Sequence, residues 1–413
     1  MKWTGSVLAA MATAGIGRSA SAEIPLVNAN GWEVSMDGRF STFVSVSQGD
    51  AQPTGIATWT GVEDRAATTS HIAMTRIRSG FINNVLGFTL GKQLAPDLKV
   101  TGRVAIWVGI SQDRSKTDNP ALDARELYFK LEGRWGGLLL GRNLSLFGRG
   151  AILQDYDIHH GQGLGHPCAI RTVRGGACGF AGHGLLFPGF SAGVVYNTPD
   201  LAGFQLTVGA FDPAANSERQ YERTPFPRFE AEIQYAMQRI FRVFVNGQWQ
   251  RIGSNTDPEL NPSASGVNGG GSVTLGPFTA GGSYYAGQGL GLYVPMENSP
   301  LFADEQGVLR KSRGYVGMAS LTFGDTKIAG GFGVTDLKMT QTEAEPFATL
   351  TIPKRQSGIS AGVYQGFYQT FTVALEFFRG TYEWYDTLEP TSGQRVSHKQ
   401  AVNFVNAGAT LIF

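Results

Sequence analysis

The sequence has no uninterrupted apolar run close to the roughly 18 residues that a membrane-spanning helix requires. It also has almost no net charge, because 34 basic residues oppose 33 acidic ones and leave +1 over 413 residues. Such a balance provides no electrostatic basis for recognising nucleic acid or a strongly anionic surface. The composition therefore predicts neither a helical membrane protein nor a nucleic-acid-binding protein.

Familiar enzyme motifs are missing as well. There is no P-loop and no H-E-x-x-H zinc motif, and we expect no serine in a nucleophile elbow. His159 and Asp155 lie near each other and near Ser145 in the sequence, but nothing around them indicates a hydrolase. We therefore expect no enzyme activity, no metal and no cofactor.

Glycine, in contrast, is abundant, with 56 residues spread along the chain, where ordinary usage is about 7%. Long helices do not tolerate this density, since each interior glycine costs roughly 1 kcal/mol relative to alanine. Strands with tight turns tolerate it better. The sequence therefore predicts an all-β protein.

The N-terminus reads as a secretory signal. Residues 1–22 have a basic residue at Lys2, a weak apolar stretch, and Ala20-Ser21-Ala22 at a suitable cleavage position. An uncleaved anchor is the alternative, but the apolar stretch is too short to span a bilayer. We expect export, with a single mature domain over residues 23–413.

Apolar and polar residues alternate in the first predicted strand, residues 33–46. One parity carries Val34, Met36, Phe40 and Val44, and the other carries Glu33, Ser35, Asp37, Arg39 and Ser41. In a soluble sandwich this pattern separates core from solvent, whereas in a membrane barrel it separates lipid from a water-filled lumen. The pattern alone does not choose between them.

The same reasoning along the chain predicts sixteen strands. They are 33–46, 72–78 with 86–94 as one interrupted strand, 98–111, 125–134, 137–143, 190–196, 204–211, 228–236, 241–251, 270–275, 278–285, 315–323, 327–334, 356–364, 370–382 and 402–413. Short turns alternate with long polar loops between them. This alternation predicts a sixteen-stranded antiparallel transmembrane β-barrel with its long loops at one end.

The longest loop covers residues 145–188 and follows two strands that meet at Gly136-Gly137. It holds both cysteines and four of the six histidines. A strand-poor loop of this length usually has a function. We expect it to fold inward and to narrow the bore of the barrel.

Aromatic residues gather near the predicted strand ends, as in the interfacial girdles of membrane barrels. They are Trp135, Phe187, Tyr196, Tyr284, Tyr285, Tyr382, Trp384 and Tyr385. Aromatic residues that border a soluble core produce the same pattern. We expect a girdle.

Three stretches resemble general diffusion porins of the Gram-negative outer membrane. They are RELYFKLEGRWGGLLLGRNLSL at 125–146, the strand-turn-strand segment 196–204, and the terminal Phe413, which resembles the signal for barrel insertion. The resemblance implies a water-filled channel in the outer membrane, usually a homotrimer, through which ions and small polar solutes diffuse passively. Its partners would be itself, outer-membrane lipid and those solutes, without nucleic acid.

The resemblance also implies a constriction in which basic residues of the wall face acidic residues of the loop. The basic candidates are Arg142, Arg39, Arg103, Arg76 and Arg78. The acidic candidates are Asp155 and Asp157, the only carboxylates between Ser145 and Pro188. The loop is otherwise basic, and a basic excess at the constriction would favour anions.

Cys168 and Cys178 are the only cysteines. In an exported protein, two cysteines that flank a glycine-rich turn favour a disulfide that pins the loop. Free thiols are one alternative. A metal site is another, although its spacing fits no standard zinc pattern; it would add His159, His160, His166 or His183.

Other functions remain open at this point. Within transport, the alternative is a substrate-specific and possibly anion-selective channel. Outside transport, the alternatives are a plugged barrel with a structural or adhesive role and a secreted soluble β-protein.

Overall fold

The computed structural model describes residues 23–413 except 52, 54–70, 111–122, 160–164, 166–175, 214–220, 223–225, 238–239, 255–261, 296–300, 305, 342, 344–351, 369 and 389–391. The predicted signal segment 1–22 therefore lies outside the described residues. Among those described, no helix is long and apolar enough to cross a membrane.

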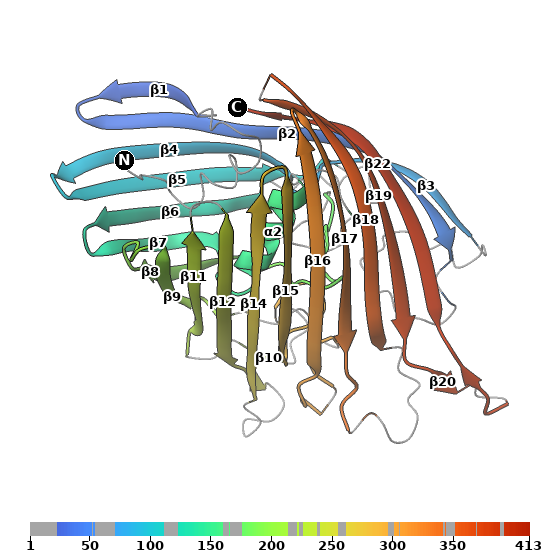
Figure 1. Ribbon diagram of the computed structural model, residues 1–413. Helices are drawn as coiled ribbons and strands as arrows, with labels where there is room; N and C mark the ends of the chain where they lie inside the picture. Colours follow the sequence, from blue (N-terminus) through green and yellow to red (C-terminus); the bar gives the residue numbers. More distant parts are fainter. Residues whose placement is uncertain are drawn as a thin grey trace.

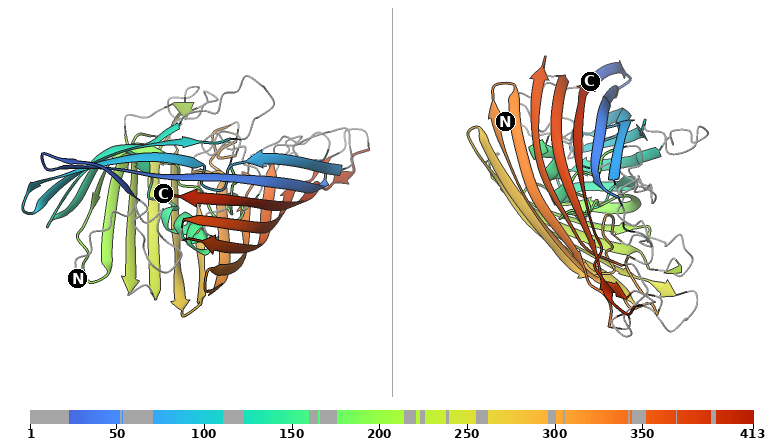
Figure 2. Two further views of the ribbon diagram at one scale, coloured as in Figure 1. Left: turned by 90° about the horizontal axis from the view of Figure 1, so that it is seen from above. Right: turned by 90° about the vertical axis from the view of Figure 1, so that its right-hand side faces the viewer.

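Sixteen strand positions of the described chain form a closed antiparallel barrel (Figures 1 and 2). In the first half they are β2 (Trp32–Asp50), β3 (His71–Arg78) with β4 (Asn84–Ala95), β5 (Leu98–Val108), β6 (Asp123–Gly133), β7 (Gly136–Leu144), β8 (Phe190–Asn197), β9 (Phe204–Phe211) and β11 (Arg228–Met237). In the second half they are β12 (Phe241–Arg251), β14 (Ser263–Leu275), β15 (Phe278–Gln288), β16 (Lys311–Phe323), β17 (Thr326–Leu337), β18 (Pro353–Phe367), β19 (Phe371–Trp384) and β22 (Lys399–Ile412). All sixteen predicted strands are confirmed.

The interruption between β3 and β4 is real, and both segments occupy one position in the ring. β2 pairs with β3 through Phe43 and Arg78, and with β4 through Arg39 and Val85. Each strand therefore covers one half of β2.

The barrel closes between β2 and β22, where Arg39 pairs with Ile412 and Gly49 with Val402. At the chain end, the backbone of Phe413 exchanges two hydrogen bonds with Gly38, at 2.6 and 3.0 Å. Its ring lies over Gly38 and meets the Phe40 ring at 5.3 Å between centroids. The terminal phenylalanine is therefore part of the closing seam.

Tight turns join the strands at one end of the barrel, as the sequence predicted. Gly276 and Gly324 each begin a two-residue hairpin turn and each has a φ of +58°. A left-handed backbone suits the right-handed twist of paired strands, and glycine adopts it without a steric cost.

Small elements that the sequence did not reveal accompany the barrel. β1 (Ile24–Ala29) forms a hairpin with the start of β2. Two-residue strands pair within the long-loop end, β10 (Tyr221–Glu222) with β13 (Gly253–Ser254) and β20 (Thr387–Leu388) with β21 (Arg395–Val396).

The polarity of the wall is inverted relative to a soluble protein. On β19, Leu375 is 57% exposed while the next residue, Glu376, is 1% exposed. On β18, Ile359 is 52% exposed and Ser360 is 5% exposed. Apolar side chains thus cover the outer face and polar ones face inward, which is the arrangement of a membrane barrel. The soluble alternative is wrong.

One helix, α2 (Arg149–His159), lies inside the barrel. In Figure 1 it appears behind β14 to β16, between them and the opposite wall of β4 to β7. It packs against β12 and β14 to β17. The described part of the loop 145–188 therefore folds inward, as expected.

The predicted aromatic girdle is only partly present. Tyr284 and Trp135 are exposed at 49% and 44%, and lie on the outside. Four of the other predicted members are buried inside the barrel instead: Phe187, Tyr285, Tyr382 and Trp384. Strand parity directs Tyr285, Tyr382 and Trp384 inward, and Phe187 belongs to the inward loop itself.

Candidate functional site

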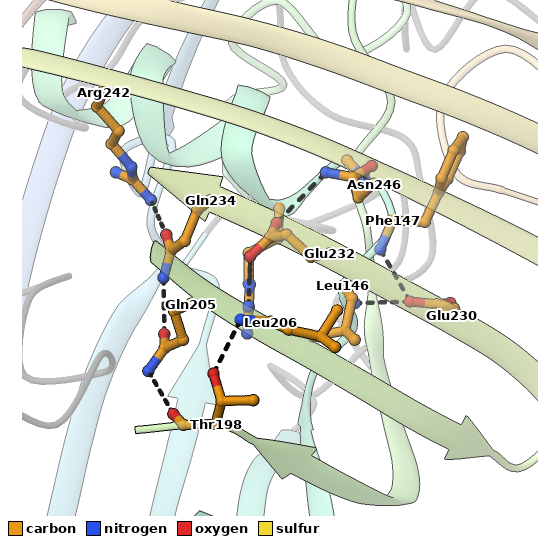
Figure 3. Close-up of polar contacts among 12 residues, drawn as sticks. Leu146, Phe147, Thr198, Gln205, Leu206, Glu230, Glu232, Gln234, Arg242 and Asn246 are labelled. Atoms are coloured by element: carbon orange, nitrogen blue, oxygen red, sulfur yellow. Dashed lines mark hydrogen bonds and ion pairs between the residues drawn. The ribbon is translucent and has the colours of Figure 1, made fainter. Parts of the chain in front are cut away.

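The inward loop begins on a fixed support. The Glu230 carboxylate accepts hydrogen bonds from the backbone N–H groups of Leu146 and Phe147, at 2.6 and 2.8 Å (Figure 3). Asn246 accepts one from Gly148 at 3.1 Å. These N–H groups lie just before the first turn of α2. The negative charge of Glu230 therefore also interacts favourably with the positive N-terminal end of the helix dipole.

The first residue of the helix is held by charge. Arg149 donates through Nε to the Glu232 carboxylate at 3.2 Å, and Asn246 donates to the same carboxylate at 3.3 Å (Figure 3). Glu232 is 2% exposed. A buried charge pair of this kind is costly to break on one side only, so it fixes where α2 begins.

The far end of α2 carries a half-buried carboxylate, Asp157. Burial raises the pKa of Asp157 to about 6, and the charges of Arg242 and Lys327 on the wall oppose that rise. Lys327 also donates to the backbone carbonyl of Asp157 at 2.8 Å. Asp157, at the end of α2, therefore lies near two cationic side chains of the barrel wall, one on β12 and one on β17.

A third cation reaches the helix from β2. Arg39 lies within hydrogen-bond reach of the Tyr156 hydroxyl. The side chain of Tyr156 is 6% exposed, and burial raises the pKa of its hydroxyl. Arg39 also makes a contact to Thr410 at 3.5 Å. The helix thus bridges the wall around β17 and the wall around β2.

A polar ladder runs around the inner wall at its short-turn end, from Arg242 on β12 across β11 and β9 to Thr198 (Figure 3). Arg242 donates to Gln234 at 3.5 Å, Gln234 to Gln205 at 2.7 Å, and Gln205 to the backbone carbonyl of Thr198 at 3.3 Å. These side chains are half-buried, so this side of the interior is hydrophilic.

The structure places Asp155 beside a histidine of its own helix. Its carboxylate contacts His159 Nδ1 at 2.9 Å, and the opposite ring nitrogen lies 3.2 Å from Ser360 Oγ. The backbone N–H of Phe180 donates to the second carboxylate oxygen at 3.2 Å. Asp155 is 2% exposed and therefore faces a histidine and the loop, and not the arginines of the wall.

The order Asp155, His159, Ser360 is that of a hydrolase triad. The letters G-x-S-x-G also surround Ser360 at 358–362, and they occur again at 189–193. Residues 358–362 lie in the middle of β18, however, and 190–193 lie in β8. A nucleophile elbow needs a strand-to-helix turn, and neither place has one.

The predicted arginines are distributed over the wall. Arg78 donates to Asn406 at 2.9 Å and to the carbonyl of Gly165 at 3.0 Å, so it ties β3 to the loop. Arg76 pairs in register with Ser45, which is buried on the inner face. Arg39, Arg76 and Arg78 therefore share the side of the wall that faces the loop.

Arg103 and Arg142 lie elsewhere. Arg103 binds Asp37 at 2.6 Å and Glu126 at 3.2 Å, two carboxylates of the wall itself. Arg142 pairs in register with Leu127, which is 59% exposed, and it contacts Asp123 at 3.3 Å. The expected grouping of Arg142 with Arg39 does not occur, because Arg142 continues the outward parity of β7.

Two cations that the sequence reading missed, Arg242 and Lys327, lie nearest to the loop carboxylate. The sequence did indicate that both face inward. Each lies at the start of a predicted strand, directly beside an apolar residue that faces outward. Those neighbours are Phe241, 39% exposed, and Ile328, 49% exposed. What the sequence could not show was the position of α2.

The described end of the loop, residues 176–188, contributes to an apolar core inside the barrel. Phe180 stacks edge-on against Phe378 with 5.6 Å between ring centroids. His183 lies 5.3 Å from Phe378 and 5.4 Å from Tyr382, and burial lowers the pKa of His183 to about 4. Cys178 is also buried in this core.

The cysteine prediction stays a prediction, because Cys168 lies outside the described residues, as do His160 and His166. Within the described part of the chain, no group of three or more His, Cys, Asp or Glu residues is arranged to hold a metal.

The sequence profile of a family described as Gram-negative porin matches residues 6–381. A comparison with curated protein sequences finds no match. Among solved structures, the outer-membrane channel DcaP of Acinetobacter baumannii has a TM-score of 0.65 and 13% identity, covering 93% of this chain and 99% of that one. OmpT of Vibrio cholerae has a TM-score of 0.54 and 15% identity, covering 94% and 100%. OmpF of Salmonella typhi has a TM-score of 0.53 and 13% identity, also covering 94% and 100%. These structural similarities concern the fold.

Proposed function

The chain belongs to the Gram-negative porin family, and we propose on that basis that it is a general diffusion channel with a mild preference for anions, assembled as a homotrimer. Family membership makes the protein an outer-membrane β-barrel through which small solutes diffuse. The selectivity, the constriction residues and the trimer are the proposed refinements.

The charge balance around α2 supports the anion preference. Of the two loop carboxylates, Asp155 is buried against His159, while Asp157 stays half-buried. The wall supplies Arg242 and Lys327 around Asp157, and Arg39 near Tyr156. Two wall cations beside one half-buried carboxylate leave an excess of positive charge at this end of α2, and a positive potential there attracts anions.

Planar-bilayer conductance in a potassium chloride gradient tests this proposal. We expect ohmic steps and a reversal potential that reports a preference for chloride. Lys327→Gln combined with Arg242→Gln should shift the reversal potential toward potassium, whereas Lys399→Gln, outside the lumen, should not. A wild-type reversal potential of the cation-selective sign would contradict the anion preference. No conductance from folded protein would favour a plugged barrel.

A substrate-specific channel is the second candidate, and one observation favours it. The loop around Phe180 and His183 packs onto Phe378 and Tyr382, so apolar side chains fill this side of the interior. A specific channel has a binding site and is blocked by its solute. Concentration-dependent block of conductance by phosphate or a sugar would replace the general channel with this candidate.

The homotrimer is supported by the family and by one structural relative. OmpT of Vibrio cholerae is described in a trimer form, with a TM-score of 0.51 and 13% identity. Chemical cross-linking in detergent should give a species of three chains, and bilayer steps should arrive in threes. A single cross-linked monomer band with single steps would contradict the trimer.

We also propose that the protein is not an enzyme and that the series Asp155, His159, Ser360 holds the loop on the wall. All three side chains are at most 5% exposed, so no substrate reaches them in this conformation. A second oxygen of Asp155 is already bound to the loop backbone. The three residues act as a structural connection between α2 and β18.

A further inference from the structure

We propose that a small cavity between α2 and the wall of β5 to β8 binds one weakly hydrated halide ion on the side chain of Arg125. The cavity has a volume of about 30 Å³, which suits a single ion and not a larger solute such as a sugar. Around the guanidinium, the lining includes Trp107, Leu144 and Phe190 of the wall and Ile152, Leu153 and Tyr156 of α2.

A β-bulge directs Arg125 into this cavity. On β6, Leu127 faces outward at 59% exposure, and plain alternation would turn Arg125 outward as well. The register between β5 and β6 shifts at this point, however, and Arg125 is left without a partner on β5. The extra residue re-aims the side chain, as bulges do, and Arg125 is only 4% exposed.

The guanidinium is fixed in place, but its terminal N–H groups are not used. Its Nε donates to the Asp123 carboxylate at 2.8 Å. Its central carbon lies 5.0 Å from the centroid of the Trp107 ring and 5.8 Å from that of Phe190. Among the described residues, the two terminal nitrogens have no hydrogen-bond partner. Unpaired donors on a buried charge are costly, so an acceptor in the cavity would be stabilised there.

The carboxylate beside Arg125 does not neutralise the site. Asp123 also contacts Arg142, at 3.3 Å, so one carboxylate serves two arginines. The neighbouring Glu126 binds Arg103 instead, at 3.2 Å. A net positive charge therefore remains beside the cavity, and it attracts an anion.

The walls of the cavity select the kind of anion. An ion that enters apolar surroundings loses its hydration, and this loss is smallest for large monovalent ions such as bromide and iodide. Sulfate, phosphate and fluoride are hydrated more strongly and lose more. The guanidinium is itself weakly hydrated, which suits such a partner. A water molecule needs roughly two to four polar partners, which apolar walls do not supply.

Halide binding at Arg125 is independent of the channel selectivity proposed above, because it is measured on the folded barrel in detergent, without conductance. Trp107 lines the cavity, so an iodide ion bound there quenches its fluorescence. Iodide titration at constant ionic strength, balanced with fluoride, should show a saturable component in addition to linear collisional quenching. Bromide should displace the bound iodide, whereas sulfate and phosphate should not. Trp107→Phe should remove the saturable component.

Arg125→Gln should weaken the saturable component roughly 10-fold or more, since the ion loses its hydrogen bonds to a charged donor. Arg251→Gln is the matched control. Arg251 also lies over an aromatic ring, 5.9 Å from that of Phe226, but it is exposed on β12 and does not line the cavity. This variant should bind iodide as the wild type does.

Leu153→Phe is a second test, which keeps the guanidinium but fills the cavity, and it should lose the saturable component as well. It decides the question if Arg125→Gln does not fold. Purely linear quenching of the folded wild type would overturn the proposal. So would a saturable component that persists in either folded variant, or sulfate that competes with iodide as well as bromide does.

Discussion

At the scale of single residues, the carboxylate of Asp157 is a group whose charge changes between pH 5 and 7. Burial raises its pKa from the ordinary 3.8 to about 6. The neighbouring Arg242 and Lys327 keep it from rising further. Since it stands among cations inside the channel, its protonation changes the field that a passing ion experiences.

We therefore expect the anion preference to increase as the pH falls from 7.5 to 5, with a midpoint at about 6. Protonation removes the one accessible loop carboxylate and leaves the cations. Reversal potentials measured at several pH values check this, and Asp157→Asn should prefer anions already at pH 7.5 and should lack the transition near pH 6. A wild-type curve without that transition would contradict the assignment.

The same group has a defined effect on stability. Its folded pKa is above its unfolded one, so the folded state holds more protons between pH 3.8 and about 6. The contribution of Asp157 to the free energy of unfolding is therefore largest at low pH and falls as the pH rises through that window. Asp157→Asn should remove this component of the pH dependence, as measured by urea unfolding.

Ser360 tests whether the hydrogen-bond series with His159 is structural. Ser360→Ala should cost about 0.5–1.5 kcal/mol, the typical contribution of one hydrogen bond, and should leave conductance close to wild type. Labelling with a fluorophosphonate should fail for the wild type, because no substrate-sized reagent reaches this serine. Stoichiometric labelling that Ser360→Ala abolishes would make the residue a nucleophile.

At the scale of elements, the position of α2 depends on a few anchors at its beginning. Glu230 binds the backbone N–H groups of Leu146 and Phe147 from the wall. The loop is otherwise held by packing around Phe180. An anchor of this kind controls how far the loop projects into the bore.

Glu230→Ala should leave two buried N–H groups without acceptors, at a cost of about 1–3 kcal/mol each. We expect the start of the loop to loosen, with larger and noisier single-channel conductance. Glu132→Ala is the matched control, because Glu132 pairs with Lys130 near the short turns and touches no part of the loop. Equal noise in the two variants would show that Glu230 does not set the loop position.

At the scale of the whole molecule, closure of the barrel brings residue 38 against residue 413. A side chain on Gly38 would lie 2.4 Å from the ring of Phe413. The terminal aromatic residue thus occupies the space that glycine leaves. Sequence-distant ends are joined only because the ring of strands closes.

Gly38→Val should weaken this closure by about 1–3 kcal/mol through overpacking. Heat-modifiable mobility on gels should show unfolding at a lower temperature. Gly317→Val is the control, since a side chain there meets nothing within 4 Å. If both variants melt together, contact at the seam is not what limits closure.

The whole-molecule charge and the local charge also lead to different conclusions. A net charge of +1 gives no indication of an anion site, yet Arg125 lies in a cavity whose other walls are uncharged. Net charge averages over the chain, whereas binding depends on which side chains the sheet brings together.

The fold class, the strands and their turns follow from the amino-acid order alone. Alternation has a period of two residues and turn chemistry is local, so both can be read from neighbours along the chain. The alternation along residues 137–143 puts Arg142 on the same outward face as Leu138 and Leu140. The family resemblance instead groups it with Arg39, and on this point the local pattern is the better guide.

Which face of each strand meets lipid, and which charges meet inside, depends on the folded barrel as a whole. The alternation at 33–46 fits a soluble core and a membrane barrel equally well, and closure of the ring resolves it in favour of lipid. Arg242 and Lys327 are 85 and 170 residues from Asp157 in the chain. They meet it because strand register and the path of α2 across the bore are set by the whole barrel, and no local pattern records either.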